Sequence, residues 1–143
     1  MQPIFKIRNR RKSGKPSRRR LGAATVELAV CLPVITILAL GAMEGSSMIF
    51  LRQALVQSAY ETVKTSVRTN SNQAEGLIRG NQVLDFRNIK ETSITFSPGS
   101  VDNLEPGTPV TVTVSAPGNS NTVFPFGPFK DQTITVQATM IKE

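Results

Sequence analysis

The chain has 143 residues, and a membrane segment would leave only about a hundred of them for a folded core, which is room for one modest domain. Its formal net charge is +7, but nine of its 17 Lys and Arg residues fall in residues 1–20, so the basic character belongs to one end. With no histidine and a single cysteine, the sequence excludes an intrachain disulfide and a structural zinc site, and it lacks the commonest general base. We therefore expect no enzyme, no cofactor, no metal and no small-molecule substrate.

The first 22 residues are expected to form a basic leader in the cytoplasm. Residues 1–20 are rich in Arg, Lys, Ser and Pro, a composition typical of a disordered arm. Positive charge beside an apolar segment stays on the cytoplasmic side of a membrane, so the topology signal is the triplet Arg18, Arg19 and Arg20. A nucleic-acid tail would need aromatic residues for base stacking, and the arm holds one, Phe5, so we expect no nucleic-acid partner.

A long apolar run follows the leader and predicts a transmembrane helix over residues 23–51. Residues 23–43 carry one charge, Glu27, and one proline, Pro33. At about 1.5 Å per residue this run spans roughly the ~30 Å hydrocarbon core of a bilayer. Pro33 is expected to kink the helix, and Cys31 to behave as a small buried hydrophobe.

Glu44 interrupts the apolar character before residues 48–51 restore it. One interpretation makes Glu44 an outer-interface residue that marks where the bilayer ends and that could pair with Arg52 or Lys64 of another helix. The other makes it a second buried carboxylate used in subunit contacts. The sequence leaves both open.

Residues 52–143 are expected to form an extracytoplasmic α+β domain that begins by continuing the same helix. Apolar residues recur four apart, with two more widening the stripe, at Leu55, Ala59, Val63 and Val67 and at Val56 and Tyr60. Polar and charged residues take the other face, at Gln57, Glu61, Lys64 and Arg68. The helix is expected to end near Asn70. A second helix from about Gln73 to Leu84 is predicted with Ala74, Leu77, Ile78 and Leu84 inward, although Gly76 and Gly80 weaken the pattern.

The last third of the chain alternates apolar and polar residues and predicts three or four antiparallel strands. The alternation covers Thr92–Phe96, Pro109–Ser115 and Gln132–Ile141, with Pro-Gly turns between. The expected fold is α+β and pilin-like: a long N-terminal helix, transmembrane in its first half, followed by a small antiparallel β-sheet. An aromatic loop either caps the sheet or forms a patch for a partner pilin, and it contains Phe124, Pro125, Phe126, Pro128 and Phe129.

Glu27 lies in an otherwise uncharged helix, where a carboxylate costs free energy unless an opposite charge offsets it. Cleavage after Gly22 would give Ala23 a free α-ammonium one helical turn from Glu27. The ammonium of one subunit could then pair with Glu27 of its neighbour and neutralise both charges.

These residues resemble bacterial type IV pilins and pseudopilins, and among them the TadE-like minor pseudopilins of the tight-adherence (Flp, type IVb) pilus. Gly22 and Glu27 match the processing motif of glycine, four residues and glutamate, while Leu28 stands where an aromatic residue is usual. The resemblance continues through residues 24–33, Glu44 and residues 52–55, and reaches the strand that ends the chain.

The resemblance implies a single-pass protein of the bacterial inner (cytoplasmic) membrane, with its N-terminus in the cytoplasm and its C-terminal domain outside. A prepilin peptidase would cut between Gly22 and Ala23, and Glu27 would direct subunit pairing. The expected partners are the lipid bilayer, this peptidase and other pilins or pseudopilins. The implied function is to support assembly or secretion of an adhesive pilus, within the fibre or beside it.

The sequence leaves two other interpretations open. The chain could be an exported soluble α+β domain, with a signal peptide cleaved near Ala39–Gly41. The basic stretch and the length of the apolar run are poorer matches to such a peptide. A membrane enzyme or receptor is the other, and the exterior domain offers it no histidine, no cysteine and no phosphate-binding loop.

Overall fold

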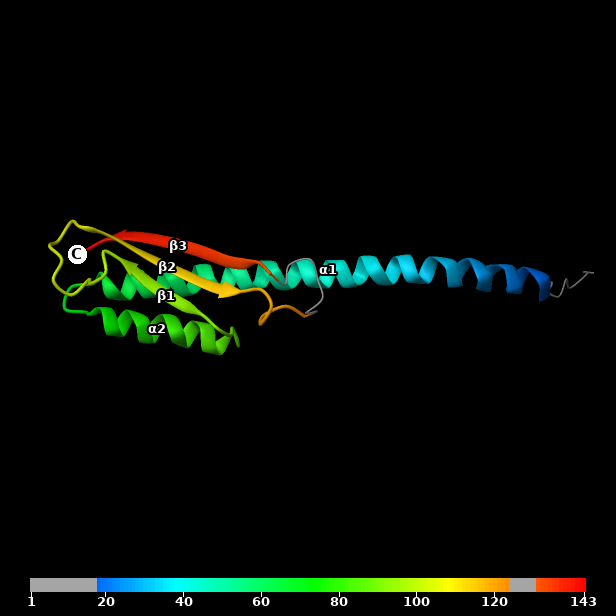
Figure 1. The fold of residues 1–143 in the computed structure, drawn as a ribbon, viewed down its shortest axis with the longest axis horizontal. Coiled ribbons are helices and arrows are strands. Elements are labelled where there is room, and N and C mark those ends of the chain that lie inside the picture. The colour runs from blue at the N-terminus through cyan, green and yellow to red at the C-terminus, as the bar shows by residue number, and fades with distance from the viewer. Residues whose placement is uncertain (1–17, 124–130) are drawn as a thin grey trace, which may run out of the picture. The chain divides into compact units, whose positions relative to one another are not determined.

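The computed structural model describes residues 18–123 and 131–143, so the predicted aromatic loop of residues 124–129 lies outside the described residues. The elements, in chain order, are α1 (Arg18–Ser66), α2 (Gln73–Phe86), β1 (Ser93–Ser97), β2 (Pro109–Pro117) and β3 (Thr133–Ile141) (Figure 1). A long helix, a second helix and a small antiparallel sheet confirm the predicted α+β class. The chain divides into two compact units, residues 1–38 and residues 39–143, and each is described by itself.

The described part of the first unit is the N-terminal stretch of α1. The helix already includes residues 18–20, so the prediction of disorder up to residue 20 is wrong for these three positions. Arginine and leucine are good helix formers, which favours an early start. The helix continues through Pro33, and Thr36 donates a 2.8 Å hydrogen bond from Oγ1 to the carbonyl of Leu32. Cys31 is exposed, contrary to expectation, because this stretch is a single helix whose apolar residues face outward.

The second unit packs the C-terminal part of α1 against the sheet. Leu55, Ala59, Val63 and Val67 are buried, which confirms the predicted stripe. They share one core with alternate residues of β2, namely Val110, Val112, Val114 and Ala116. Burial of these side chains supplies the main favourable term in folding the unit.

The sheet has three strands in the order β1-β2-β3, both pairs antiparallel. In the middle of the sheet Val112 pairs with Phe96 on one side and with Ala138 on the other. The predicted strands are confirmed with small shifts of their ends, and β2 continues to Pro117. The chain's last residues close the domain, since the amide of Glu143 donates to the carbonyl of Val67 at 2.9 Å and Lys142 Nζ donates to the carbonyl of Ser66 at 3.2 Å.

The buried face of α1 is wider than the four-residue stripe, but not on the side predicted. Val56 and Tyr60 remain 50 % and 45 % exposed, so the prediction that they widen the core is wrong. Three small polar residues are buried instead, namely Ser58, Thr62 and Ser66. They form one row at spacing four, on the opposite flank of the stripe from Val56 and Tyr60, and they face α2.

α2 confirms the second helix and the inward position of Leu84, but not the inward positions predicted for Ala74 and Ile78. Asn72 caps it, since its side-chain oxygen accepts a 2.8 Å hydrogen bond from the amide of Glu75. Ala74 and Ile78 are exposed, whereas Gly76, Gly80 and Leu84 are buried. The two glycines lie against the hydroxyl row of α1, and Ser58 Oγ donates a 3.0 Å hydrogen bond to the carbonyl of Gly80. Glycine permits this approach, so what reads as weak helix sequence is a packing surface.

Candidate functional site

The first feature with functional meaning is the apolar surface of α1. Every residue from Gly22 to Met43 is exposed, including a series of large apolar side chains at Val26, Leu28, Val30, Leu32, Val34, Ile35, Ile37 and Leu38. Soluble monomers rarely leave so much contiguous apolar surface uncovered. Within residues 18–123 and 131–143, one helix, Gly22–Ser66, is long and apolar enough to cross a membrane. It is therefore a candidate membrane span.

The residues of the predicted processing site all lie on this helix. Gly22, Ala23 and Glu27 are exposed, and a Cβ built on Gly22 would meet nothing within 4 Å. Ala23 and Glu27 are four residues apart, which puts them on the same helix face. The arginine triplet lies in the first turn of α1. Cleavage, subunit pairing through Glu27 and topology remain predictions.

Glu44 is 3 % exposed and is covered by its own chain. Its burial contradicts the predicted pairing with Arg52 or Lys64 of another helix, which needs an exposed carboxylate, whereas the position of Glu44 at the outer edge of the bilayer remains a prediction. The carboxylate is buried, as the second interpretation requires, and its use in subunit contacts remains a prediction.

Val56 and Tyr60, which were predicted to widen the core, belong instead to an outward stripe on α1. Ile49, Gln53, Val56 and Tyr60 line a shallow, mostly apolar groove together with Arg52 and Gln57. Their spacing of four, three and four residues is typical of a helix face that packs against another helix. The spacing of Ile49, Gln53, Val56 and Tyr60 is a sequence signal for this stripe, but Val56 and Tyr60 also lie next to the stripe at Leu55 and Ala59, which favours the prediction that they are buried.

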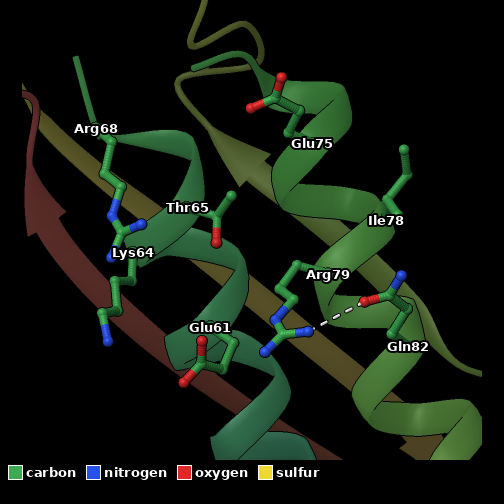
Figure 2. A pocket seen from close by; sticks show the side chains of 8 residues that line it. All are labelled: Glu61, Lys64, Thr65, Arg68, Glu75, Ile78, Arg79 and Gln82. Atoms are coloured by element: carbon green, nitrogen blue, oxygen red, sulfur yellow. Dashed lines mark hydrogen bonds between the residues drawn. The ribbon is translucent and has the colours of Figure 1, made fainter. Parts of the chain in front are cut away.

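A second groove runs between α1 and α2 and is charged (Figure 2). Its lining has three cations, Lys64, Arg68 and Arg79, and two carboxylates, Glu61 and Glu75. Figure 2 shows Arg79 extending from α2 toward α1, and its Nη1 donates a 3.2 Å hydrogen bond to Gln82 Oε1. Such mixed charge does not select one ligand chemistry.

The apolar stretch and the outward stripe belong to one segment that is shared with known proteins. Residues 22–64 match the TadE-like protein family. The match confirms the predicted resemblance over this TadE-like segment, which begins at Gly22, contains Glu27 and Glu44, and covers most of α1. No curated protein and no solved structure matches the chain.

The family model covers 43 of the 143 residues, less than half of the chain, and this similarity suggests a protein associated with the tight-adherence (Tad) pilus. Proteins of this family are structural components linked to the pilus and are not known as enzymes. Other pilus components are the partners that the family suggests, and the candidate span on the TadE-like segment is consistent with a membrane-anchored component.

Proposed function

We propose that this protein is a minor pseudopilin-like subunit, anchored in the bacterial inner membrane by α1, that supports assembly or secretion of an adhesive tight-adherence pilus. The observation that carries the proposal is where the family match falls. Residues 22–64 cover a helix whose first half is apolar and exposed, and whose second half supports a folded domain. A pilin-like subunit needs both properties in one helix.

The proposed topology divides the chain into a cytoplasmic leader of residues 1–22, a span of residues 23–51 and an outer domain of residues 52–143. Charge supports the orientation, since Arg18, Arg19 and Arg20 directly precede the apolar run and lysine and arginine beside a span stay in the cytoplasm. The span has 29 residues, about 43 Å of helix, against ~40–45 Å for a bilayer with its headgroups.

A prepilin peptidase would cut this subunit between Gly22 and Ala23. The exposure of both residues and the open space around Gly22 support access. After cleavage, the new ammonium of Ala23 and the carboxylate of Glu27 would lie one turn apart on each helix. Pairing between neighbouring subunits would offset the cost of holding either charge in the membrane.

Contacts with other pilus subunits would use the outward stripe of Ile49, Gln53, Val56 and Tyr60. The stripe lies on the TadE-like segment, and neither the sheet nor α2 covers it. A helix from another subunit laid along it would bury the exposed parts of Val56 and Tyr60 and gain hydrophobic free energy.

The family match does not favour the exported soluble domain. It runs from residue 22 to residue 64, on both sides of the Ala39–Gly41 position where a signal peptidase would cut. A chain cut there would lose the first part of the TadE-like segment.

Two glycine substitutions test the proposal against that alternative. Gly22→Val and Gly41→Val are matched controls, because a side chain at either position meets nothing within 4 Å and the domain should fold in both variants. We expect Gly22→Val to leave an uncut precursor in the membrane, and Gly41→Val to give a chain beginning at Ala23. N-terminal sequencing after membrane fractionation reads both results. A soluble product that starts near Ala42 and disappears in Gly41→Val would refute the proposal.

A further inference from the structure

An aromatic side chain stands almost fully in solvent at the end of α2. Phe86 is 89 % exposed, although it closes a helix whose other face packs on α1. Scattered apolar residues on a surface need no explanation. Phe86 is different because of what surrounds it.

Arg87 holds the end of α2 beside the two turns of α1 between Phe50 and Gln57. Its guanidinium lies 5.4 Å from the centre of the Phe50 ring, and its Nη2 donates a 2.6 Å hydrogen bond to Gln57 Oε1. The cation–π contact and the hydrogen bond together hold this end against α1. Phe50 lies at the end of the span proposed above, so the exposed ring of Phe86 is held near the level where the helix would leave the bilayer.

Two loops at the same end of the unit are tied together. Asn121 accepts a 2.8 Å hydrogen bond from the amide of Lys90 and donates through Nδ2 to the carbonyls of Lys90 and Pro117 at 3.0 and 2.9 Å. The second loop carries Val123, which is exposed and lines a hollow with Met43 and Phe50. In Figure 1 the end of α2 and the start of β1 lie at this same end of the unit. Hydrogen bonds therefore join the loop after α2 to the loop that carries Val123.

Among the described residues, the charges around this end are mixed and balanced. The basic groups are Arg52, Arg87 and Lys90, and the exposed acids are Asp85 near the end of α2, Glu91 in the loop after it and Asp131 before β3. Lipid phosphates would attract the bases and repel the acids, so charge alone would give weak attachment. Insertion of the exposed apolar side chains has to provide most of the free energy of membrane binding.

We propose that this end of the outer unit, the membrane-facing rim formed by Phe50, Phe86, Arg87, Lys90 and Val123, rests on the outer surface of the lipid bilayer with Phe86 inserted among the lipids. The inference rests on the proposed function, because it needs α1 as the anchor. It adds a second lipid contact, which would fix the orientation of the outer domain on the membrane. An aromatic ring and a long basic side chain suit the layer between hydrocarbon and water.

The chain contains no tryptophan, so single-tryptophan variants report from one site each. Full-length Phe86→Trp, Ile78→Trp and Ile37→Trp would be placed in vesicles of phosphatidylethanolamine and phosphatidylglycerol. One set of vesicles carries bromine on the acyl chains near the headgroups, where it quenches tryptophan on contact. Ile78 is the matched control, since it is 59 % exposed on the same helix two turns from Phe86. Ile37 lies within the proposed span and reports on the anchor.

We expect bromine to quench Ile37→Trp and Phe86→Trp strongly, with blue-shifted emission, and to leave Ile78→Trp close to its unquenched intensity. Quenching at residue 37 with no more at residue 86 than at residue 78 would overturn the rim contact and leave the anchor standing. Failure to quench residue 37 would overturn the anchor, and the rim contact with it. Blue-shifted but unquenched emission of Phe86→Trp that grows with protein density would mean that another copy covers Phe86, which also overturns the proposal.

Discussion

The close packing of α2 on α1 makes Gly76→Ala destabilising, although the same change usually favours a helix. In an exposed helix it stabilises by up to about 1 kcal/mol, because alanine has less backbone freedom to lose. At Gly76 the added methyl would lie 2.8 Å from the carbonyl oxygen of Thr62 and 3.1 Å from Cβ of Ser66, and would overlap Ser66 Oγ. That hydroxyl is itself held by a 2.9 Å hydrogen bond to Thr62, so it cannot turn away without loss.

The size of the effect follows from these neighbours. Overpacking typically costs about 1–3 kcal/mol, and a backbone carbonyl cannot rotate to make room, which favours the upper end of the range. Subtracting about 1 kcal/mol for helix propensity leaves a net loss of about 2 kcal/mol. Separation of α2 from α1 should then become roughly 30-fold more frequent.

Hydrogen exchange measured by mass spectrometry on the full chain in vesicles would detect this change as faster exchange of the α2 amides. Asn81→Ala is the matched control, because Asn81 is exposed on the same helix and its replacement should slow exchange slightly through helix propensity. Equal or slower exchange of α2 in Gly76→Ala would refute the reasoning, since it would mean that the helices are not in the contact described.

Three further predictions follow from neighbouring positions on α1. Leu55→Ala should destabilise the outer unit by about 2–5 kcal/mol and Val56→Ala by less than about 0.5 kcal/mol, because the first side chain is fully buried and the second faces outward; urea-dependent proteolysis would show this, and similar losses would contradict it. Glu27→Ala should insert normally yet lose crosslinks to other pilus subunits, so unchanged crosslinking would count against its pairing role. Cys31 should resist a membrane-impermeant maleimide in sealed vesicles and react after detergent is added, whereas rapid labelling before detergent would argue against burial in lipid.

Much of the fold could be predicted because local patterns specify it. The period of two in Val110, Val112 and Val114 identified the central strand and its inward face. The spacing of Leu55, Ala59 and Val63 did the same for the second half of α1. In each case the pattern consists of residues close together in the sequence, so it can be recognised without knowing which segments pack against it.

The errors arose where the decisive contact joins distant parts of the chain. In the sequence, Gly76 and Gly80 only weaken the helix pattern. In the structure, they lie against the hydroxyls of Ser66 and Thr62 and form a packing surface. The pattern of apolar residues cannot predict such a contact, because glycine and serine are not apolar enough to contribute to it. α2 therefore covers the flank of the stripe that carries Ser58, Thr62 and Ser66, and Val56, on the other flank, stays exposed.

The candidate site divides in the same way. The exposed apolar helix and the family motif at Gly22 and Glu27 could be predicted, because composition and short spacing carry them. The burial of Glu44 and the position of Phe86 could not, because both depend on which segments come together in the outer unit.

The two halves of α1 face different surroundings, and this bears on how a subunit could move from membrane to fibre. No residue from Gly22 to Met43 is buried by the chain, whereas buried positions recur every three or four residues from Leu51 to Val67. The outer domain therefore needs only the second half of the helix for its core, and lipid or another subunit can cover the first half. Exchanging one cover for the other would leave the contacts of Leu55, Val63 and the sheet unchanged, so transfer to a fibre would not require the domain to refold.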